Sequence, residues 1–142
     1  MRFLLDTNIV SEARKGVRAN PGVLAWLKAT PASWLWTSVL VLGELRRGVE
    51  SLRRRDPLSA EILDRWLRDH RAAQAGRVLQ VDEAVALRWG LLNVRDPVPT
   101  VDGLLAATAI VHGMTLVTRN TKDVVRTGAT LLNPFDAPRA DA

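Results

Sequence analysis

The chain of 142 residues is 47% hydrophobic and 25% charged, which fits a single domain with one buried core. It contains no cysteine and no apolar run near the roughly 18 residues of a membrane span, so disulfides, thiolate sites and a transmembrane helix are excluded and we expect a cytoplasmic protein. The net charge of +5 favours polyanions as partners, although an arginine-rich solvated surface explains it equally well.

The first half of the chain alternates between strand and helix patterns. Asn20-Pro21 introduces the second helix, and Asp56-Pro57 separates the last two. In chain order, the expected elements are a strand over 2–6, helices over 7–15 and 23–28, a strand over 34–37, and helices over 39–53 and 57–75.

The second half continues the alternation. Gly113 marks the end of a helix that Thr100 begins as its cap, after a loop over 96–99. The expected elements are strands over 78–81, 115–118 and 130–132, and helices over 82–92 and 100–112. Strands that alternate with helices predict an α/β fold, with a central, mostly parallel sheet of four to five strands flanked by helices.

Three acids stand out against this pattern. Asp6 lies at the carboxyl end of the first strand, and Asp102 lies in the first turn of the helix that leads to the fourth strand. Both can face one crevice, because ligands of parallel sheets bind at the carboxyl ends of the strands. Glu44 interrupts an apolar run over 39–45, and a charge placed there requires a partner.

Each acid also has an ordinary structural explanation. Asp6 can cap a helix, Asp102 can complement a helix dipole, and Glu44 can pair with Arg46 or Arg47 on its own helix. These explanations weaken when the acids are taken together, because three carboxylates near one crevice repel one another unless a cation neutralises them or their pKa values rise. Carboxylate oxygens suit Mg²⁺ or Mn²⁺.

Five stretches, in order and at family spacing, closely resemble the PIN-domain ribonucleases and, within them, the VapC-type toxins of bacterial type II toxin–antitoxin pairs. The resemblance extends from Arg2 to about Phe135, so 1–135 is interpreted as a PIN domain and 136–142 as a frayed tail. The stretches are 4–8 (LLDTN), 41–45 (VLGEL), 100–109 (TVDGLLAATA), 116–120 (LVTRN) and 133–135 (NPF).

The resemblance implies a PIN-like three-layer sandwich and a metal-dependent endoribonuclease. It implies an acidic cluster of Asp6, Glu44 and Asp102, in which Asp6 and Asp102 bind Mg²⁺, or Mn²⁺, directly and Glu44 either binds it through water or orients the water like a base. The metal would polarise the scissile RNA phosphate and activate a water for in-line attack.

One position departs from the family pattern. Many relatives carry a fourth acid just after the fourth strand, where this chain has Asn120, with Asp123 three residues later. Either Asp123 supplies the fourth catalytic carboxylate, or it only complements the start of a short helix and the site has three acids.

Four further side chains are candidates for orienting the acidic cluster through hydrogen bonds, since a carboxylate ligand is usually held by such bonds. Capping and turn formation are the alternative roles for these residue types. The candidates are Thr7, Asn8, Ser38 and Asn120.

The arginine-rich stretches have two interpretations. Arg46-Arg47, 53–55 and the helically spaced Arg65, Arg68 and Arg71 can guide RNA along the rim of the cleft, or they can form solvated helix faces.

Two other functions stay open from the residues alone. A haloacid dehalogenase-like phosphatase also begins with an apolar strand and Asp, but it requires a second acid where Asn8 stands. A catalytically silent, basic nucleic-acid-binding module is compatible with the arginine content.

The family resemblance implies an RNA substrate, a VapB-type antitoxin whose C-terminal segment covers the acidic cleft, a homodimer, and contact with operator DNA only through the antitoxin complex.

Overall fold

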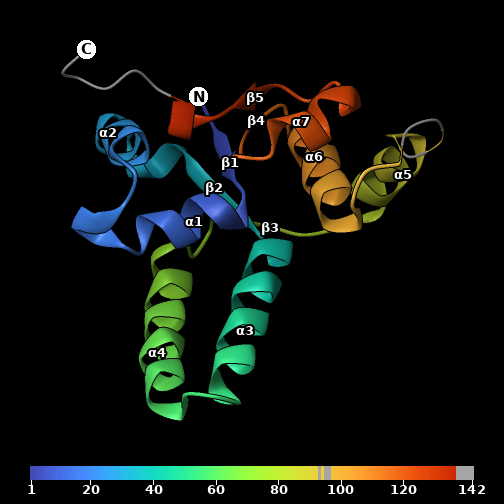
Figure 1. The fold of residues 1–142 in the computed structure, drawn as a ribbon. Coiled ribbons are helices and arrows are strands. Elements are labelled where there is room, and N and C mark those ends of the chain that lie inside the picture. The colour runs from blue at the N-terminus through green and yellow to red at the C-terminus, as the bar shows by residue number, and fades with distance from the viewer. Residues whose placement is uncertain (93, 95–96, 137–142) are drawn as a thin grey trace.

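Five short strands form one fully parallel sheet in the order β3-β2-β1-β4-β5 (Figure 1). The computed structural model describes residues 1–92, 94 and 97–136. The expected α/β class and flanked central sheet are confirmed. The strands are β1 Phe3–Leu5, β2 Leu35–Ser38, β3 Val78–Leu79, β4 Thr115–Val117 and β5 Leu131–Leu132.

Helices cover both sides of this sheet. In Figure 1, α1 and α2 lie on one side and α5, α6 and α7 on the other, while α3 and α4 extend away as a helical hairpin. The helices are α1 Thr7–Ala13, α2 Pro21–Ala29, α3 Val39–Arg53, α4 Pro57–Ala73, α5 Glu83–Leu92, α6 Thr100–His112 and α7 Thr121–Val124, with short 3-10 helices η1 Gly16–Arg18, η2 Ala32–Trp34, η3 Val125–Thr127 and η4 Pro134–Asp136.

The expected elements differ from the observed ones mainly at their ends. Thr100 is the first residue of α6 and not its cap. Pro99 occupies the cap position, where it has no side chain able to accept a hydrogen bond. Asp136, which we assigned to the tail, lies in η4, and the rest of the predicted tail, 137–142, lies outside the described residues. Within the described part of the chain, no helix has the length and apolar character that a membrane crossing requires.

The central strand positions the first acid. Leu4 pairs with Leu116 and Leu5 with Val117, and all four side chains are buried, so both faces of β1 are covered. This register places the next residues, Asp6 and Thr118, side by side at the carboxyl edge. Because the chain continues to β2 on one side of β1 and later to β4 on the other, this edge is a topological switch point, where α/β folds bind ligands.

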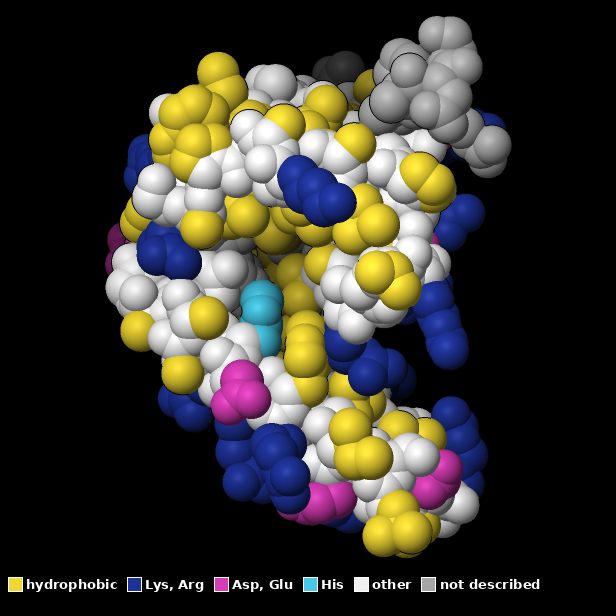
Figure 2. Space-filling view, turned by 90° about the vertical axis from the view of Figure 1, so that its left-hand side faces the viewer, with side chains coloured by type: hydrophobic (Ala, Val, Ile, Leu, Met, Phe, Trp, Pro, Cys, Tyr) yellow, Lys and Arg dark blue, Asp and Glu magenta, His cyan; other side chains and the backbone are white. Residues whose placement is uncertain are grey.

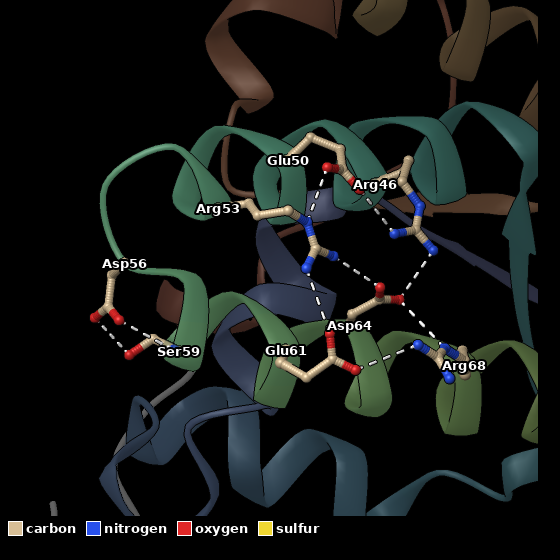
Figure 3. A network of polar contacts seen from close by, with 8 residues as sticks. All are labelled: Arg46, Glu50, Arg53, Asp56, Ser59, Glu61, Asp64 and Arg68. Carbon is tan, nitrogen blue, oxygen red and sulfur yellow. Dashed lines mark hydrogen bonds and ion pairs between the residues drawn. The ribbon is translucent and has the colours of Figure 1, made fainter.

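The hairpin is fastened by a network of ion pairs centred on Asp64 (Figure 3). Its carboxylate, on a side chain only 9% exposed, accepts hydrogen bonds from Arg53 at 3.0 Å, Arg46 at 3.1 Å and Arg68 at 3.4 Å. Glu50 and Glu61 bind the same arginines. The guanidinium groups of Arg46 and Arg68 lower the pKa of Asp64 to about 2.

This network bears on the two interpretations of the arginine-rich stretches. Arg46, Arg53 and Arg68 are partly exposed and paired with acids of the same hairpin, as in a solvated helix face, and their role toward RNA stays a prediction. Figure 2 shows Lys and Arg gathered on the lower part of the molecule, which is the hairpin, together with Asp and Glu, below a hollow lined by hydrophobic side chains.

The Asp64 network predicts an acid-sensitive hairpin. The pKa of Asp64 in the folded state lies below its ordinary value of 3.8, so its contribution to stability is present above pH 3.8 and is lost as the pH falls toward 2. We expect Asp64→Asn to lower the Tm at pH 7 by several degrees and to flatten the loss of stability in acid. Thermal unfolding between pH 2 and pH 7 measures both effects. Asp69→Asn, at an exposed position on the same helix, is the control, and an equal effect of the two variants would contradict the network's role.

Gly103 allows α5 and α6 to pack closely. A methyl group at this position would stand 2.8 Å from Val98 Cγ2 and 3.2 Å from the Trp89 ring. We expect Gly103→Ala to lower the free energy of unfolding by about 1–3 kcal/mol in urea titrations, through overpacking. Gly90→Ala on α5, where nothing lies within 4 Å, should be neutral or stabilising by up to about 1 kcal/mol because alanine favours a helix. A stabilising Gly103→Ala would show that the contact is not tight.

Candidate functional site

Asp6 is a carboxylate buried at the end of the central strand, with 5% of its surface exposed. It accepts hydrogen bonds from the Thr7 backbone N at 2.6 Å, from Thr118 Oγ1 at 2.7 Å and from Asn8 Nδ2 at 3.2 Å. Burial raises its pKa, and these three bonds oppose the rise without cancelling it, while the charge of Glu44 adds to it. Asp6 therefore caps α1, as one interpretation held, and its raised pKa shows that these bonds do not fully offset the cost of burying its charge.

Thr118 is a site residue that the sequence analysis missed. Its buried hydroxyl donates to Asp6 Oδ2 and accepts from the Asn120 backbone N at 3.0 Å. A threonine is unremarkable in a strand, so residue type alone gave no signal. The signal was positional, because Thr118 directly follows the strand that pairs in register with β1.

Glu44 reaches the same place from α3. Its Oε1 accepts a hydrogen bond of 2.6 Å from Thr7 Oγ1, so Thr7 contacts Asp6 through its backbone and Glu44 through its side chain. The alternative pairing within α3 is wrong for Arg46, whose guanidinium binds Glu50 and Asp64.

Asp102 completes the first group of acids from the opposite wall. It lies in the first turn of α6, and its pKa is raised to about 6, first by burial and then by the charges of Asp6, Asp123 and Glu44. Four acids from four elements thus influence one another at one strand edge. A cation bound among these carboxylates would offset their mutual repulsion.

The two candidates for the fourth position lie at the start of α7. Asn120 occupies the cap position without a side-chain capping bond, and its backbone N binds Thr118. Asp123 stands in the first turn of α7, and its charge acts on Asp102. The carboxylate of Asp123, and not the amide of Asn120, is therefore the group that adds negative charge to the cluster.

Two of the expected orienting residues behave differently. Asn8 connects Asp6 to the next loop, since its Oδ1 accepts from the Arg119 backbone N at 3.3 Å. Ser38 instead caps α3 by accepting from the Leu40 N at 3.0 Å. It forms no hydrogen bond with an acid among the residues that the structure describes, so of the two roles considered for Ser38 the structure shows capping. A serine between a strand and a helix satisfies the exposed helix N–H groups first.

The donor chemistry of the cluster fits a hard divalent cation. In the described ranges, no three acidic or histidine side chains converge closely enough to hold a metal ion by themselves. Mg²⁺ does not require such a cage, because proteins usually bind it through one or two carboxylates plus water and substrate phosphate oxygens. The carboxylates of Asp6, which is buried, and Asp102, which is half-buried, match that ligand set, and the charge of Asp6 acts on Asp102.

Comparisons with known proteins place this fold and site in context. A family model described as "PIN domain" matches residues 3–128. The chain is 31% identical to VapC ribonuclease Y4jK of Sinorhizobium fredii, over 94% of this chain and 98% of that protein. It is 30% identical to Toxin FitB of Neisseria gonorrhoeae, over 94% and 98%. A solved structure of FitAB bound to an IR36 DNA fragment superposes with a TM-score of 0.85 at 28% identity, covering 97% of this chain and 99% of that chain.

The raised pKa of Asp102 predicts that the cluster destabilises the fold. A carboxyl with a pKa of about 6 in the folded state and 3.8 when unfolded contributes stability only while protonated, so stability falls as the pH rises through this window. We expect Asp102→Asn to raise the free energy of unfolding at pH 7 by about 1 kcal/mol, discounted for partial exposure, and to remove this pH dependence. Urea unfolding at pH 4 and pH 7, with Asp69→Asn as the control, measures the effect. A less stable Asp102→Asn at pH 7 would contradict mutual repulsion.

Proposed function

Because the chain belongs to the PIN-domain family, we propose that it is a metal-dependent endoribonuclease that acts as the toxin of a toxin–antitoxin pair. The resemblance inferred from the five sequence stretches is confirmed by the family match and by relatives at about 30% identity over nearly the whole chain. The observation that carries the proposal is that Asp6, Glu44 and Asp123 all act electrostatically on Asp102 near the switch point of the sheet.

In this proposal Asp6 and Asp102 bind Mg²⁺, or Mn²⁺, directly, Glu44 binds it through water, and Asp123 contributes the fourth negative charge. The bound cation supplies Lewis-acid chemistry, in which a phosphate is polarised and the pKa of a water is lowered. Asp102, with a pKa of about 6, is ionised at pH 7 and available as a ligand.

The other residues of the site hold these carboxylates in place. Thr118 and Asn8 donate to the same oxygen of Asp6, Oδ2, and so limit its rotation. Thr7 fixes Glu44 relative to Asp6. Carboxylates that are held before the substrate arrives lose less entropy when the reacting groups assemble.

The two other candidate functions gain no support. A haloacid dehalogenase-like phosphatase requires an acid at the position of Asn8, which instead is an amide that donates to Asp6. A silent binding module gives no reason to gather mutually repelling carboxylates in a basic protein, since they weaken the attraction for nucleic acid.

The proposal includes partners. A VapB-type antitoxin would cover the acidic cleft, with an arginine in the place of the cation. The relative FitAB is seen bound to DNA, and by analogy this chain would reach operator DNA through its antitoxin complex. We propose further that the toxin is a homodimer.

A cleavage assay tests the enzymatic part. Purified protein should degrade single-stranded RNA with Mg²⁺, stop in EDTA, and lose at least about 100-fold in rate as Asp6→Asn, because one ligand of the cation is lost. Asp69→Asn should cleave at the wild-type rate. Equal RNA degradation by wild type and Asp6→Asn would contradict the proposal, and turnover of small phosphomonoesters without RNA cleavage would indicate a phosphatase.

A further inference from the structure

A cavity of about 480 Å³ lies beside the acidic cluster and shares Asp123 with it, but the rest of its lining has no role in the function proposed above. Its volume is within the range of small-molecule sites. The lining is polar and charged, and it is drawn from segments far apart in the chain. It includes Asn20, Arg119, Lys122, Asp123, Asn133 and Phe135.

One electrostatic interaction and one chain of hydrogen bonds connect the cavity to the acids. Asp123 lines the cavity and also acts electrostatically on Asp102. The Arg119 backbone N donates to Asn8, whose side chain donates to Asp6. The edge of the cavity is therefore tied to the acidic cluster by hydrogen bonds through Asn8 and shares Asp123 with it.

The wall of the cavity contains a flat cationic surface. The guanidinium carbon of Arg119 lies 4.6 Å from the centroid of the Phe135 ring. Asn133 holds the turn that presents this ring, because its Oδ1 accepts from the Phe135 N and its Nδ2 donates to Asp136. Aromatic rings and guanidinium planes are the surfaces on which unpaired RNA bases stack.

The cations of the cavity are available to an anion. Neither Arg119 nor Lys122 forms an ion pair with any carboxylate in the described part of the chain, whereas Arg46, Arg53 and Arg68 of the hairpin are all paired. Glu12 is the acid that feels the charge of Arg119, but its pKa is lowered first by Lys15, to which it is bonded at 2.6 Å. Asp123 and Asp136 also line the cavity, but the two cations are not held in ion pairs with them and can turn to a phosphate.

We infer that this cavity is a nucleotide subsite, in which the RNA nucleotide next to the cleaved phosphodiester stacks its base on the Arg119–Phe135 pair and places its phosphate near Lys122. The inference rests on the proposed ribonuclease function. It makes Phe135 and Arg119 determinants of where the RNA is cut, because the base they hold sets which phosphate reaches the acids.

Binding measured without cleavage tests the subsite. In an Asp6→Asn background, fluorescence anisotropy with a short labelled single-stranded RNA of mixed sequence should show binding about tenfold weaker for Phe135→Leu. Phe135→Tyr, which keeps the ring, should restore it. Trp34→Leu removes a half-exposed aromatic ring outside the cavity and should leave the affinity unchanged. Lys122→Ala should weaken binding and reduce its salt dependence more than Arg65→Ala on the hairpin does.

Crosslinking locates the base directly. RNA substituted with 4-thiouridine and irradiated on the Asp6→Asn protein should label the tryptic peptide that contains Phe135. Labelling confined to the α3–α4 hairpin, or unchanged RNA affinity for a folded Phe135→Leu, would overturn the subsite. A poly-glutamate peptide that displaces RNA equally well from wild type and from Phe135→Leu would indicate a general surface for acidic peptides. That result would also overturn the subsite.

The binding, crosslinking and cleavage experiments together distinguish a failure of this inference from a failure of the proposed function. If wild type cleaves RNA and Phe135→Leu binds and cleaves like wild type, the subsite is wrong and the ribonuclease stands. If wild type does not cleave RNA but the crosslink and the Phe135 dependence are found, the ribonuclease is wrong and the cavity binds nucleotides nonetheless.

Discussion

The structure depends on one costly placement, a carboxylate buried at the end of the central strand. Asp6 cannot move to solvent, because β1 is paired on both sides and covered on both faces. Hydrogen bonds from Thr7, Asn8 and Thr118 offset part of the cost of burying its charge, yet its pKa remains raised. These three residues, two of them close to Asp6 in the chain and one far from it, thus act together to stabilise a buried carboxylate. A site of this kind is maintained at the expense of stability.

The same protein uses its arginines in two ways. On the α3–α4 hairpin, Asp64 and its neighbouring acids neutralise three of them, and the hairpin is fastened by the result. Beside the acidic cluster, Arg119 rests on Phe135 without an ion-pair partner among the described residues. The net charge of +5 is therefore not a uniform property of the surface. What matters for a polyanion is which cations the protein has left unpaired.

Much of the fold was predictable from local pattern, since strands and helices here alternate with clear apolar periodicity. The span of α3 was predicted to the residue. The site was predictable less evenly. Asp6, Glu44 and Asp102 were noticed because a charge in an apolar run, or at a strand end, contradicts its surroundings. Thr118 was missed because a threonine at the end of a strand is ordinary, and its importance comes from its hydrogen bond to Asp6, 112 residues away.

The sequence by itself determined the class of fold, the family and the identity of the principal acids, because these follow from periodicity and from short motifs whose residues are close in the chain. Only the tertiary structure decided which side chains meet. In the folded chain Thr118 donates a hydrogen bond to Asp6, and Glu44 accepts one from Thr7. Ser38 caps a helix, and the charge of Asp123 acts on Asp102. The physical reason is that strand register and helix packing fix these distances, and neither is written in any local stretch of sequence.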